Sequence, residues 1–218
     1  MDNRETEAGM RILAIETSTA QASLSLYLNG EVSVNREWKA ERNHDAHLFP
    51  ALQAAMDTLG GDAPDYILVG SGPGSYGGVR VALAAATGIA QVTGAAVVAL
   101  CSWIQLEKDG AVVVSDAKRG GWTLRRPDGS ISVVSTTDVL ELAQQGVAIH
   151  TTEVPGTLAA RGIPADEEGL SPTAKGLIYS WLRMTPQQQS AAAAAPIEPI
   201  YVRPPHITKA VRKPWEIH

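Results

Sequence analysis

The sequence predicts an α/β protein with two lobes, each carrying a mixed β-sheet. The length of 218 residues leaves room for one large domain or two small ones, at roughly 150 residues per domain. Segments with the period of a strand alternate along the chain with segments of helical period. After Trp103 the sequence changes to short strand candidates separated by polar turns. Hydrophobic residues at 44% and charged residues at 19% are typical of a globular protein.

The first lobe is predicted to begin with three strands. They cover Arg11–Glu16, Ala22–Leu28 and Glu31–Glu37, and the second has leucine at alternate positions. Asn29-Gly30 lies between the last two strands, and this dipeptide is typical of a tight two-residue hairpin. The lobe therefore opens with a three-stranded meander.

Two helices and two buried strands are predicted to follow the meander. Asn43 is a candidate N-cap for a helix that ends at Gly60-Gly61. The later elements are a strand, a glycine-rich loop, a helix and a strand, over Tyr66–Val69, Gly70–Gly78, Val79–Thr93 and Ala95–Leu100. The predicted order of the first lobe is βββαβαβ.

The second lobe is predicted to be smaller and to mix helices with strands. Its candidate strands are Ala111–Ser115, Trp122–Arg126, Ile131–Val134 and Val147–His150. Its candidate helices are Asp138–Gln145 and a last helix that Ser171-Pro172 opens and that runs through Leu182. Gln187–Ala195 either extends this helix or serves as a linker. We expect lobes at 1–103 and 104–198, followed by a tail at 199–218.

The charge balance limits the classes of partner. With 18 Lys and Arg against 23 Asp and Glu, the net charge is -5, so the surface as a whole repels phosphate backbones. A local basic strip in the tail is the exception, formed by Arg203, His206, Lys209, Arg212 and Lys213. No export signal is visible, and the uncharged stretch Val81–Cys101 is too rich in alanine and polar residues for a membrane span. We expect a cytoplasmic protein that does not contact membranes.

The glycine-rich loop is the first candidate site. It lies between a strand and a helix, where backbone amides and the helix dipole can hold an anion. The turn at the end of the first strand adds one carboxylate and several hydroxyls. The candidate phosphate-binding residues are Glu16, Thr17, Ser18, Gly72, Gly74 and Ser75. The alternatives are a ligand-free tight turn for the loop and hydroxyls that only satisfy turn amides. A dinucleotide site is not supported, because no acidic residue occurs between Asp65 and Glu107.

The helix after the loop has a ridge of small residues. Gly78, Ala82, Ala86, Ala90 and Gly94 recur every four residues, so another element can approach this ridge closely. Spacing alone favours packing against the sheet of the same lobe. The functional alternative is a helix-to-helix interface with a partner.

The sequence supports no catalytic residue and no metal site. His44 and His47 are three residues apart, but only Asp45 offers a nearby third ligand. No serine lies in a G-x-S-x-G turn. The single cysteine, Cys101, lies in an apolar run that is typical of a protein core.

Four segments of the chain resemble the TsaB family, also called YeaZ, the partner subunit of bacterial tRNA threonylcarbamoyladenosine synthesis. They are Ile12–Ser18, the loop Gly72–Arg80, Asp116–Gly120 and Pro199–Arg203, and the loop is the most specific of them. The resemblance implies the ASKHA fold of actin and the sugar kinases, in which the end of the chain can return to the first lobe. The family's usual pattern is not followed at Glu16, Tyr76-Gly77 and Gly121-Trp122, where Asp, Phe-Thr and Glu-Val are commoner.

The resemblance also implies a function. TsaB proteins are non-catalytic scaffolds that pair with the catalytic paralogue TsaD, which binds ATP and a metal, so this chain needs no cofactor of its own. The paired metal-binding histidines of that paralogue have no counterpart in Cys101–Leu106. TsaE and tRNA are further members of the assembly, and the chain alone can form a homodimer. The implied interface residues are His44, His47, Leu48, Ala51, Gly78, Ala82, Ala86 and Ala90.

Two other functions stay open. The first is a nucleotide-binding ATPase or a phosphotransferase-like enzyme of the same fold, with Glu16, the glycine-rich loop and Asp116 around the nucleotide. The second is a small-molecule binding protein that needs no partner. Tight ATP binding by the isolated chain would favour the first of these.

Overall fold

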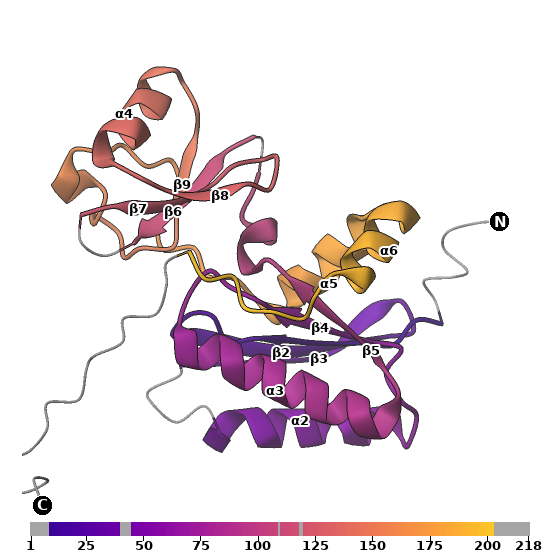
Figure 1. Ribbon diagram of the computed structural model, residues 1–218. Helices are drawn as coiled ribbons and strands as arrows, with labels where there is room; N and C mark the ends of the chain where they lie inside the picture. The colour runs from indigo at the N-terminus through magenta and orange to yellow at the C-terminus, as the bar shows by residue number, and fades with distance from the viewer. Residues whose placement is uncertain (1–8, 40–44, 109, 118–119, 203–218) are drawn as a thin grey trace, which may run out of the picture.

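The computed structural model describes residues 9–39, 45–108, 110–117 and 120–202. Figure 1 shows a larger lobe, in which helices lie on both faces of a sheet, and a smaller lobe joined to one end of it. The larger lobe holds a five-stranded sheet and the smaller lobe a four-stranded one. The fold class is α/β with two mixed sheets, as the sequence predicts.

The five-stranded sheet has the order β3-β2-β1-β4-β5. Its strands are β1 (Ile12–Glu16), β2 (Gln21–Leu28), β3 (Glu31–Lys39), β4 (Tyr66–Gly70) and β5 (Ala96–Leu100). The first three pair antiparallel, whereas β4 pairs parallel to both β1 and β5. Asn29 and Gly30 have φ of 55° and 87°, which are the left-handed values that a tight hairpin turn requires. The predicted meander is confirmed.

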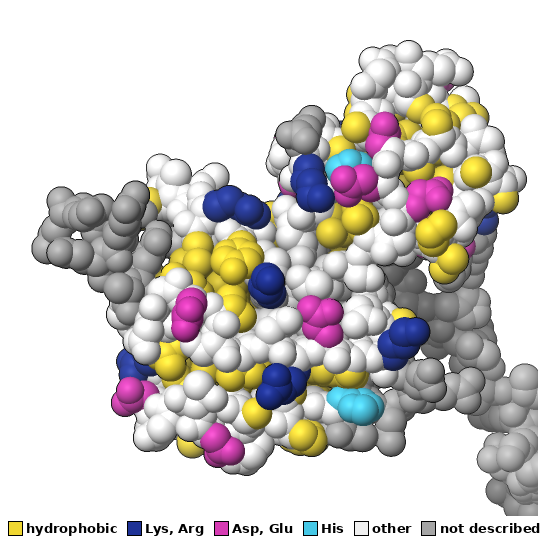
Figure 2. Space-filling view, turned by 180° about the vertical axis from the view of Figure 1, so that it is seen from behind, with side chains coloured by type: hydrophobic (Ala, Val, Ile, Leu, Met, Phe, Trp, Pro, Cys, Tyr) yellow, Lys and Arg dark blue, Asp and Glu magenta, His cyan; other side chains and the backbone are white. Residues whose placement is uncertain are grey.

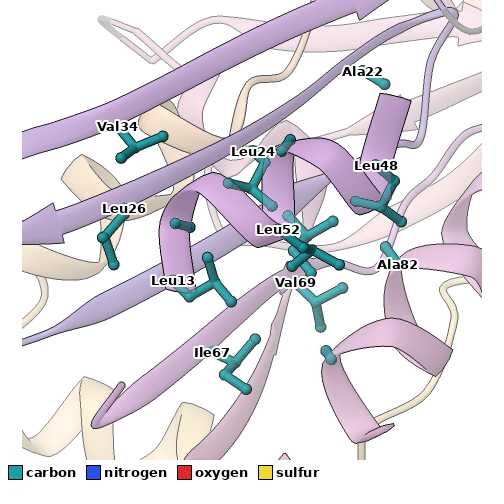
Figure 3. Packing of buried hydrophobic residues seen from close by; sticks show 14 of the residues in the cluster. Leu13, Ala22, Leu24, Leu26, Val34, Leu48, Leu52, Ile67, Val69 and Ala82 are labelled. Carbon is teal, nitrogen blue, oxygen red and sulfur yellow. The ribbon is translucent and has the colours of Figure 1, made fainter. Parts of the chain in front are cut away.

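Both faces of this sheet are covered. On one face, Leu13, Leu24 and Val69 pack against α2 (Asp45–Leu59) and α3 (Tyr76–Thr93), as Figure 3 shows. On the other face, Ile12 and Leu68 pack against α5 (Ala174–Arg183). Alternate residues of β1 therefore belong to two separate apolar clusters, because successive side chains of a strand point to opposite faces.

The four-stranded sheet has the order β8-β7-β6-β9. Its strands are β6 (Val112–Asp116), β7 (Trp122–Arg125), β8 (Ile131–Val134) and β9 (Ile149–Thr151). The helix α4 (Thr136–Gln144) follows β8, and Ser135 caps it in a reciprocal pair with Asp138. Trp122, Leu124 and Val139 are buried in the core of this lobe. The strands and the helix lie close to their predicted positions.

The predicted lobe 104–198 needs a correction. Both α5 and α6 (Pro186–Ala194) pack on the five-stranded sheet, α5 against β1, β2 and β4 and α6 against β5. The smaller lobe is therefore an insertion between β5 and α5. The Gln187–Ala195 segment forms its own helix, since Thr185 caps it and Pro186 occupies its first position. After α6, residues 199–202 return to the first lobe beside the glycine-rich loop.

The surface carries both signs of charge. On the face that Figure 2 shows, Lys and Arg side chains lie among Asp and Glu side chains without an extended patch of one sign. Within the described residues, no helix combines the length and the apolar character that crossing a bilayer requires. The basic strip predicted from Arg203 onward lies outside the described residues.

Candidate functional site: the glycine-rich loop and helix α3

The glycine-rich loop joins β4 to α3. The Ser75 hydroxyl accepts a hydrogen bond from the amide of Gly78, so this side chain caps the helix and α3 begins at Tyr76. The predicted start at Val79 is too late by one turn. Gly77 and Gly78 are consequently helical residues, and the loop proper is shorter than the sequence suggests.

Two glycines of this region are needed because two backbone segments meet there. A Cβ atom at Gly78 would overlap the carbonyl oxygen of Thr17, and one at Gly74 would overlap the carbonyl oxygen of Ser18. The turn after β1 therefore lies directly against the loop and the start of α3. Glycine at these positions permits the close approach.

Hydrogen bonds join the loop to the turn after β1. The amide of Ser75 donates to the carbonyl oxygen of Ser18 at 2.6 Å. The Thr17 hydroxyl donates to the carbonyl oxygen of Gly78 at 2.7 Å. Two of the groups that could face a phosphate are thus already bonded within the chain. The candidate residues Glu16, Thr17, Ser18, Gly72, Gly74 and Ser75 do come together, but they mostly bind one another.

Glu16 is buried beneath the loop. One carboxylate oxygen accepts a hydrogen bond from the amide of Ser18 at 2.7 Å, and the other has no partner. The side chain fills the space beside Gly70, where any Cβ would overlap it. Burial raises the pKa of this carboxyl group, against the opposing effect of the hydrogen bonds from Ser18. The Glu16 carboxylate is shielded from solvent and is unsuited to a ligand.

A cleft of about 520 Å³ separates the loop from the smaller lobe. The segment 200–202 lines the cleft, and the amide of Ile200 donates to the carbonyl oxygen of Ser71 at 2.7 Å. Tyr201 stacks on Tyr76 with ring centroids 5.1 Å apart, and its hydroxyl accepts a hydrogen bond from Arg80 at 3.1 Å. The returning chain therefore forms one wall of the cleft next to the glycine-rich loop.

The opposite wall carries two carboxylates. Asp116 at the end of β6 lines the cleft, as does Glu153 just after β9. One oxygen of Glu153 accepts hydrogen bonds from the Ser115 hydroxyl at 2.6 Å and from the amide of Asp116 at 2.9 Å. The sequence alone does not point to Glu153, because only the parallel pairing of β6 with β9 brings it beside Asp116. The acidic groups of this wall are unfavourable for a phosphate.

The small-residue ridge of α3 faces the protein's own core. Gly78, Ala82 and Ala86 are buried, and the two alanines belong to the cluster between α3 and the sheet. Leu48 and Ala51 of α2 are buried in the same cluster. As interface residues these five predictions need a correction, because side chains enclosed in the core are not available to a partner. Spacing on its own cannot distinguish the two uses of a ridge.

Three predicted interface residues remain. Ala90 is half-buried near the end of α3. His47 is exposed on α2 and stacks with Trp38, at 6.3 Å between ring centroids. His44 lies outside the described residues. Among the residues that the structure describes, no three His, Cys, Asp or Glu side chains gather as metal ligands would.

The outward face of α3 also carries small and apolar residues, beside the exposed Arg80, Thr87 and Gln91. Gly77, Ala84, Gly88 and Val92 are exposed, and Val92 is 88% accessible. Their spacing places them along one side of the helix. α2, which packs in the same cluster as α3, exposes Phe49, the only phenylalanine of the chain. We call the outward residues Gly77, Ala84, Gly88 and Val92 the outer stripe.

Comparison with known proteins identifies relatives of the region around this site. Residues 38–119 match the family model described as TsaD, tRNA N6-adenosine threonylcarbamoyltransferase. An 83-residue segment is 37% identical to the tRNA threonylcarbamoyladenosine biosynthesis protein TsaB of Escherichia coli, over 37% of this chain and 36% of that protein. The corresponding TsaB protein of Haemophilus influenzae is 36% identical over 83 residues, or 35% of its length. Part of the chain is therefore similar to proteins of the TsaB/YeaZ family.

The match to these two TsaB proteins spans about a third of their length. Over 89% of this chain, an uncharacterized protein of Mycobacterium tuberculosis is 27% identical, and 92% of that protein is covered. Among solved structures, YeaZ from Pseudomonas aeruginosa matches with a TM-score of 0.63 and 22% identity, over 88% of this chain and 99% of that one. A second Pseudomonas aeruginosa protein, described as similar to peptidase YEAZ, gives 0.68 and 21%, over 89% and 100%. At these identities the structures establish the fold alone, which this chain shares with YeaZ.

Proposed function

We propose that the chain is a non-catalytic subunit of a complex that makes N6-threonylcarbamoyladenosine in tRNA, and that it binds and activates a catalytic TsaD subunit. The observation that carries this proposal is the similarity of an 83-residue segment to TsaB proteins, together with the match of residues 38–119, which include the glycine-rich loop and α3, to the TsaD family model. ATP and metal would bind the partner subunit. TsaE would join the same assembly, and tRNA would be held mainly by the other subunits.

The geometry of the loop supports a role without phosphate chemistry. An enzyme of this fold would need loop amides that point toward a bound phosphate. Here the amide of Ser75 is bonded to Ser18, and Gly78 lies against the Thr17 carbonyl. The loop braces α3 against the first strand of the sheet, so it serves to hold that helix in place.

The outer stripe is the surface that we propose for TsaD. Gly77, Ala84 and Gly88 lack bulky side chains, which would let a helix of the partner approach α3 closely. Arg80 is the only charged residue of α3, so a partner would desolvate few charges there. Without TsaD, the same stripe could pair two copies of this chain in a homodimer.

A nucleotide-binding enzyme remains the second candidate, because the Asp116 and Glu153 carboxylates line the cleft beside the loop. Bound magnesium could link such carboxylates to a phosphate. Titration of the isolated chain with magnesium-ATP separates the two candidates. The scaffold proposal expects no saturable binding and no hydrolysis by the chain alone.

The interface test substitutes Gly88→Arg. Gly88 is exposed and nothing lies within 4 Å of where its Cβ would be, so the folded helix tolerates the larger residue. We expect the affinity for the cognate TsaD, measured by co-purification and calorimetry, to fall by at least about tenfold. Ala193→Arg on the exposed side of α6 is the matched control and should leave the affinity unchanged.

Equal affinity of the Gly88→Arg variant and the original chain would exclude the outer stripe as the interface. The pathway role has an independent test, which is the threonylcarbamoyladenosine content of bulk tRNA after depletion of the protein. Unchanged content would contradict the proposed function as a whole.

A further inference from the structure

Within the described residues, two segments connect the lobes, and hydrogen bonds and buried contacts hold both of them. The first crossover, residues 101–108, leaves β5 and enters the smaller lobe. The second crossover, residues 167–173, leads from the smaller lobe to α5. Rotation of two lobes requires a few residues whose backbone torsion angles can change. The contacts of these two segments decide whether such residues exist.

The first half of the first crossover is bound to the larger lobe. The amide of Ser102 donates to the carbonyl oxygen of Gly72 at 2.8 Å, and its hydroxyl accepts from the amide of Gly72 at 3.0 Å. The side chain of Trp103, the next residue, is buried in a cluster with Leu106 and with Val113 of β6 in the smaller lobe. The backbone of Ser102 is therefore fixed to the glycine-rich loop, and the side chain that follows it is fixed to the smaller lobe.

Gln105 joins the two crossovers to each other. Its side-chain oxygen accepts hydrogen bonds from the amide and the hydroxyl of Thr173, at 2.9 and 3.1 Å. Its side-chain nitrogen donates to the carbonyl oxygens of Thr173 and Ser102, at 3.1 and 3.3 Å. A Cβ at Gly176 would overlap the Gln105 amide, so the glycine makes room for this side chain. All the hydrogen-bonding capacity of the amide is directed at the lobe junction.

The next residues of the first crossover are bound to the smaller lobe. Nδ1 of the buried His150, on β9, donates to the carbonyl oxygen of Leu106 at 2.9 Å. Glu107 forms an ion pair with Arg125 of β7, and both side chains are largely buried. Leu106 follows Gln105 directly, so neighbouring residues are fixed to different lobes with no residue between them.

The backbone of the second crossover is held almost as tightly as that of the first. The amide of Leu170 donates to the carbonyl oxygen of Thr151 in β9 at 3.0 Å. Thr173 is held by Gln105, and the next amide, that of Ala174, donates to the Ser23 hydroxyl of β2 at 2.8 Å. Only Ser171 and the buried Pro172 lie between these anchors, and the proline ring fixes its own φ.

We propose that Gln105 is a positioning residue that locks both crossovers, so that the two lobes form one rigid body with a preset angle. The cleft between the lobes then keeps its width and does not close on a small ligand. This conformational property belongs to the isolated chain and does not depend on whether the chain binds TsaD. A partner that contacts both lobes would bind a surface whose two halves already have a fixed relative orientation.

The test measures the distance between the lobes with pairs of spin labels by pulsed electron paramagnetic resonance. The labels are placed at Thr58→Cys on α2 and Glu141→Cys on α4, both exposed, in a chain in which Cys101 is replaced by alanine. Dilution with unlabelled protein removes distances between copies. We expect one narrow distance distribution that saturating magnesium-ATP leaves unchanged.

Gln105→Ala removes all four hydrogen bonds and should broaden the distribution or add a second distance. Gln187→Ala, at an exposed position of α6, is the matched control and should leave it narrow. If Gln105→Ala does not fold, Gln105→Glu serves instead, since it keeps the acceptor for Thr173 but loses the donor. Several distances in the original chain, a shift on adding magnesium-ATP, or a narrow distribution in a folded Gln105 variant would overturn the proposal.

Discussion

The two faces of α3 are built from similar residues but have different surroundings. The inward face, with Gly78, Ala82 and Ala86, lies against the sheet and the turn after β1. The outer stripe, with Gly77, Ala84 and Gly88, is exposed, and among the described residues no atom lies within 4 Å of a Cβ built at Gly77 or Gly88. On the inward face, small size is explained by the fold. On the outer stripe, contacts within the described residues do not explain the small size, and the proposed interface with a partner would.

This difference shows what residue spacing can and cannot tell. A step of four residues identifies one side of a helix, but not which side faces the core. The decisive information is the position of the neighbouring backbone, which comes from contacts distant in the sequence. Substitutions on the two faces therefore should have opposite effects on stability.

Ala86→Arg should have the largest effect. Ala86 is fully buried against the sheet, so the substitution places an unpaired charge and a long side chain in the core. We expect the free energy of unfolding to fall by more than about 4 kcal/mol, which would unfold most domains. Circular dichroism and urea unfolding measure this. A folded, soluble Ala86→Arg variant would show that the ridge is more open than the structure indicates.

Gly78→Ala tests how closely the inward face of α3 packs against the turn after β1. The added methyl group would overlap the Thr17 carbonyl oxygen, so the turn after β1 or the start of α3 must shift. Overpacking of this kind costs about 1–3 kcal/mol, less the small gain in helix propensity. The midpoint of thermal unfolding reports the loss. An unchanged midpoint would contradict the close approach of the two backbones.

Glu16→Gln tests the buried carboxyl group beside Gly70 through the pH dependence of stability. Burial raises the pKa of Glu16 in the folded state above the ordinary value of 4.5. As the pH rises past that value, the unfolded chain loses its proton while the folded chain keeps it, so stability falls until the folded-state pKa is passed. Glutamine keeps the acceptor for the Ser18 amide and should abolish this decline.

Urea unfolding of both proteins between pH 4 and pH 8 gives the comparison. The variant should gain stability relative to the original chain as the pH rises. Parallel curves for the two proteins would mean that the pKa of Glu16 in the folded state is not raised above its ordinary value.

Gly88→Ala is the matched substitution on the outer stripe and should have the smallest effect. Nothing lies within 4 Å of its Cβ position, so the change only improves helix propensity. We expect a gain of about 0.5–1 kcal/mol in the free energy of unfolding. The contrast with the loss at Gly78 is the sharpest measure of the difference between the two faces. A loss at Gly88 would remove that contrast.

Much of the fold follows from local sequence. Asn29-Gly30 fixes the hairpin, and alternating leucines give the strand that follows β1. The position of α5 could not be predicted in this way. Its cap at Thr173 and its apolar face identify a helix but not the sheet that it covers. That choice depends on Leu177 and Trp181 meeting β1 and β4, more than a hundred residues earlier in the chain.

The site was less predictable than the fold. The sequence places Glu16, Thr17, Ser18 and Ser75 correctly in one region, because two motifs follow neighbouring strands of the sheet. It does not reveal that these groups bond to each other, since this depends on how closely Gly74 and Gly78 let two backbones approach. Gln105 and Glu153 were missed altogether. Each is an ordinary polar residue until the fold brings Thr173 or Ser115 beside it.

The insertion of the smaller lobe between β5 and α5 has a consequence for synthesis on the ribosome. One face of the first sheet, with Ile12 and Leu68, is covered by α5, which is made only after the whole inserted lobe. At a translation rate of 5–20 residues per second, the gap from β5 to α5 lasts on the order of ten seconds. During that interval the nascent chain exposes a finished apolar sheet face. Chaperone binding to this face before residue 177 emerges is the expected safeguard against aggregation.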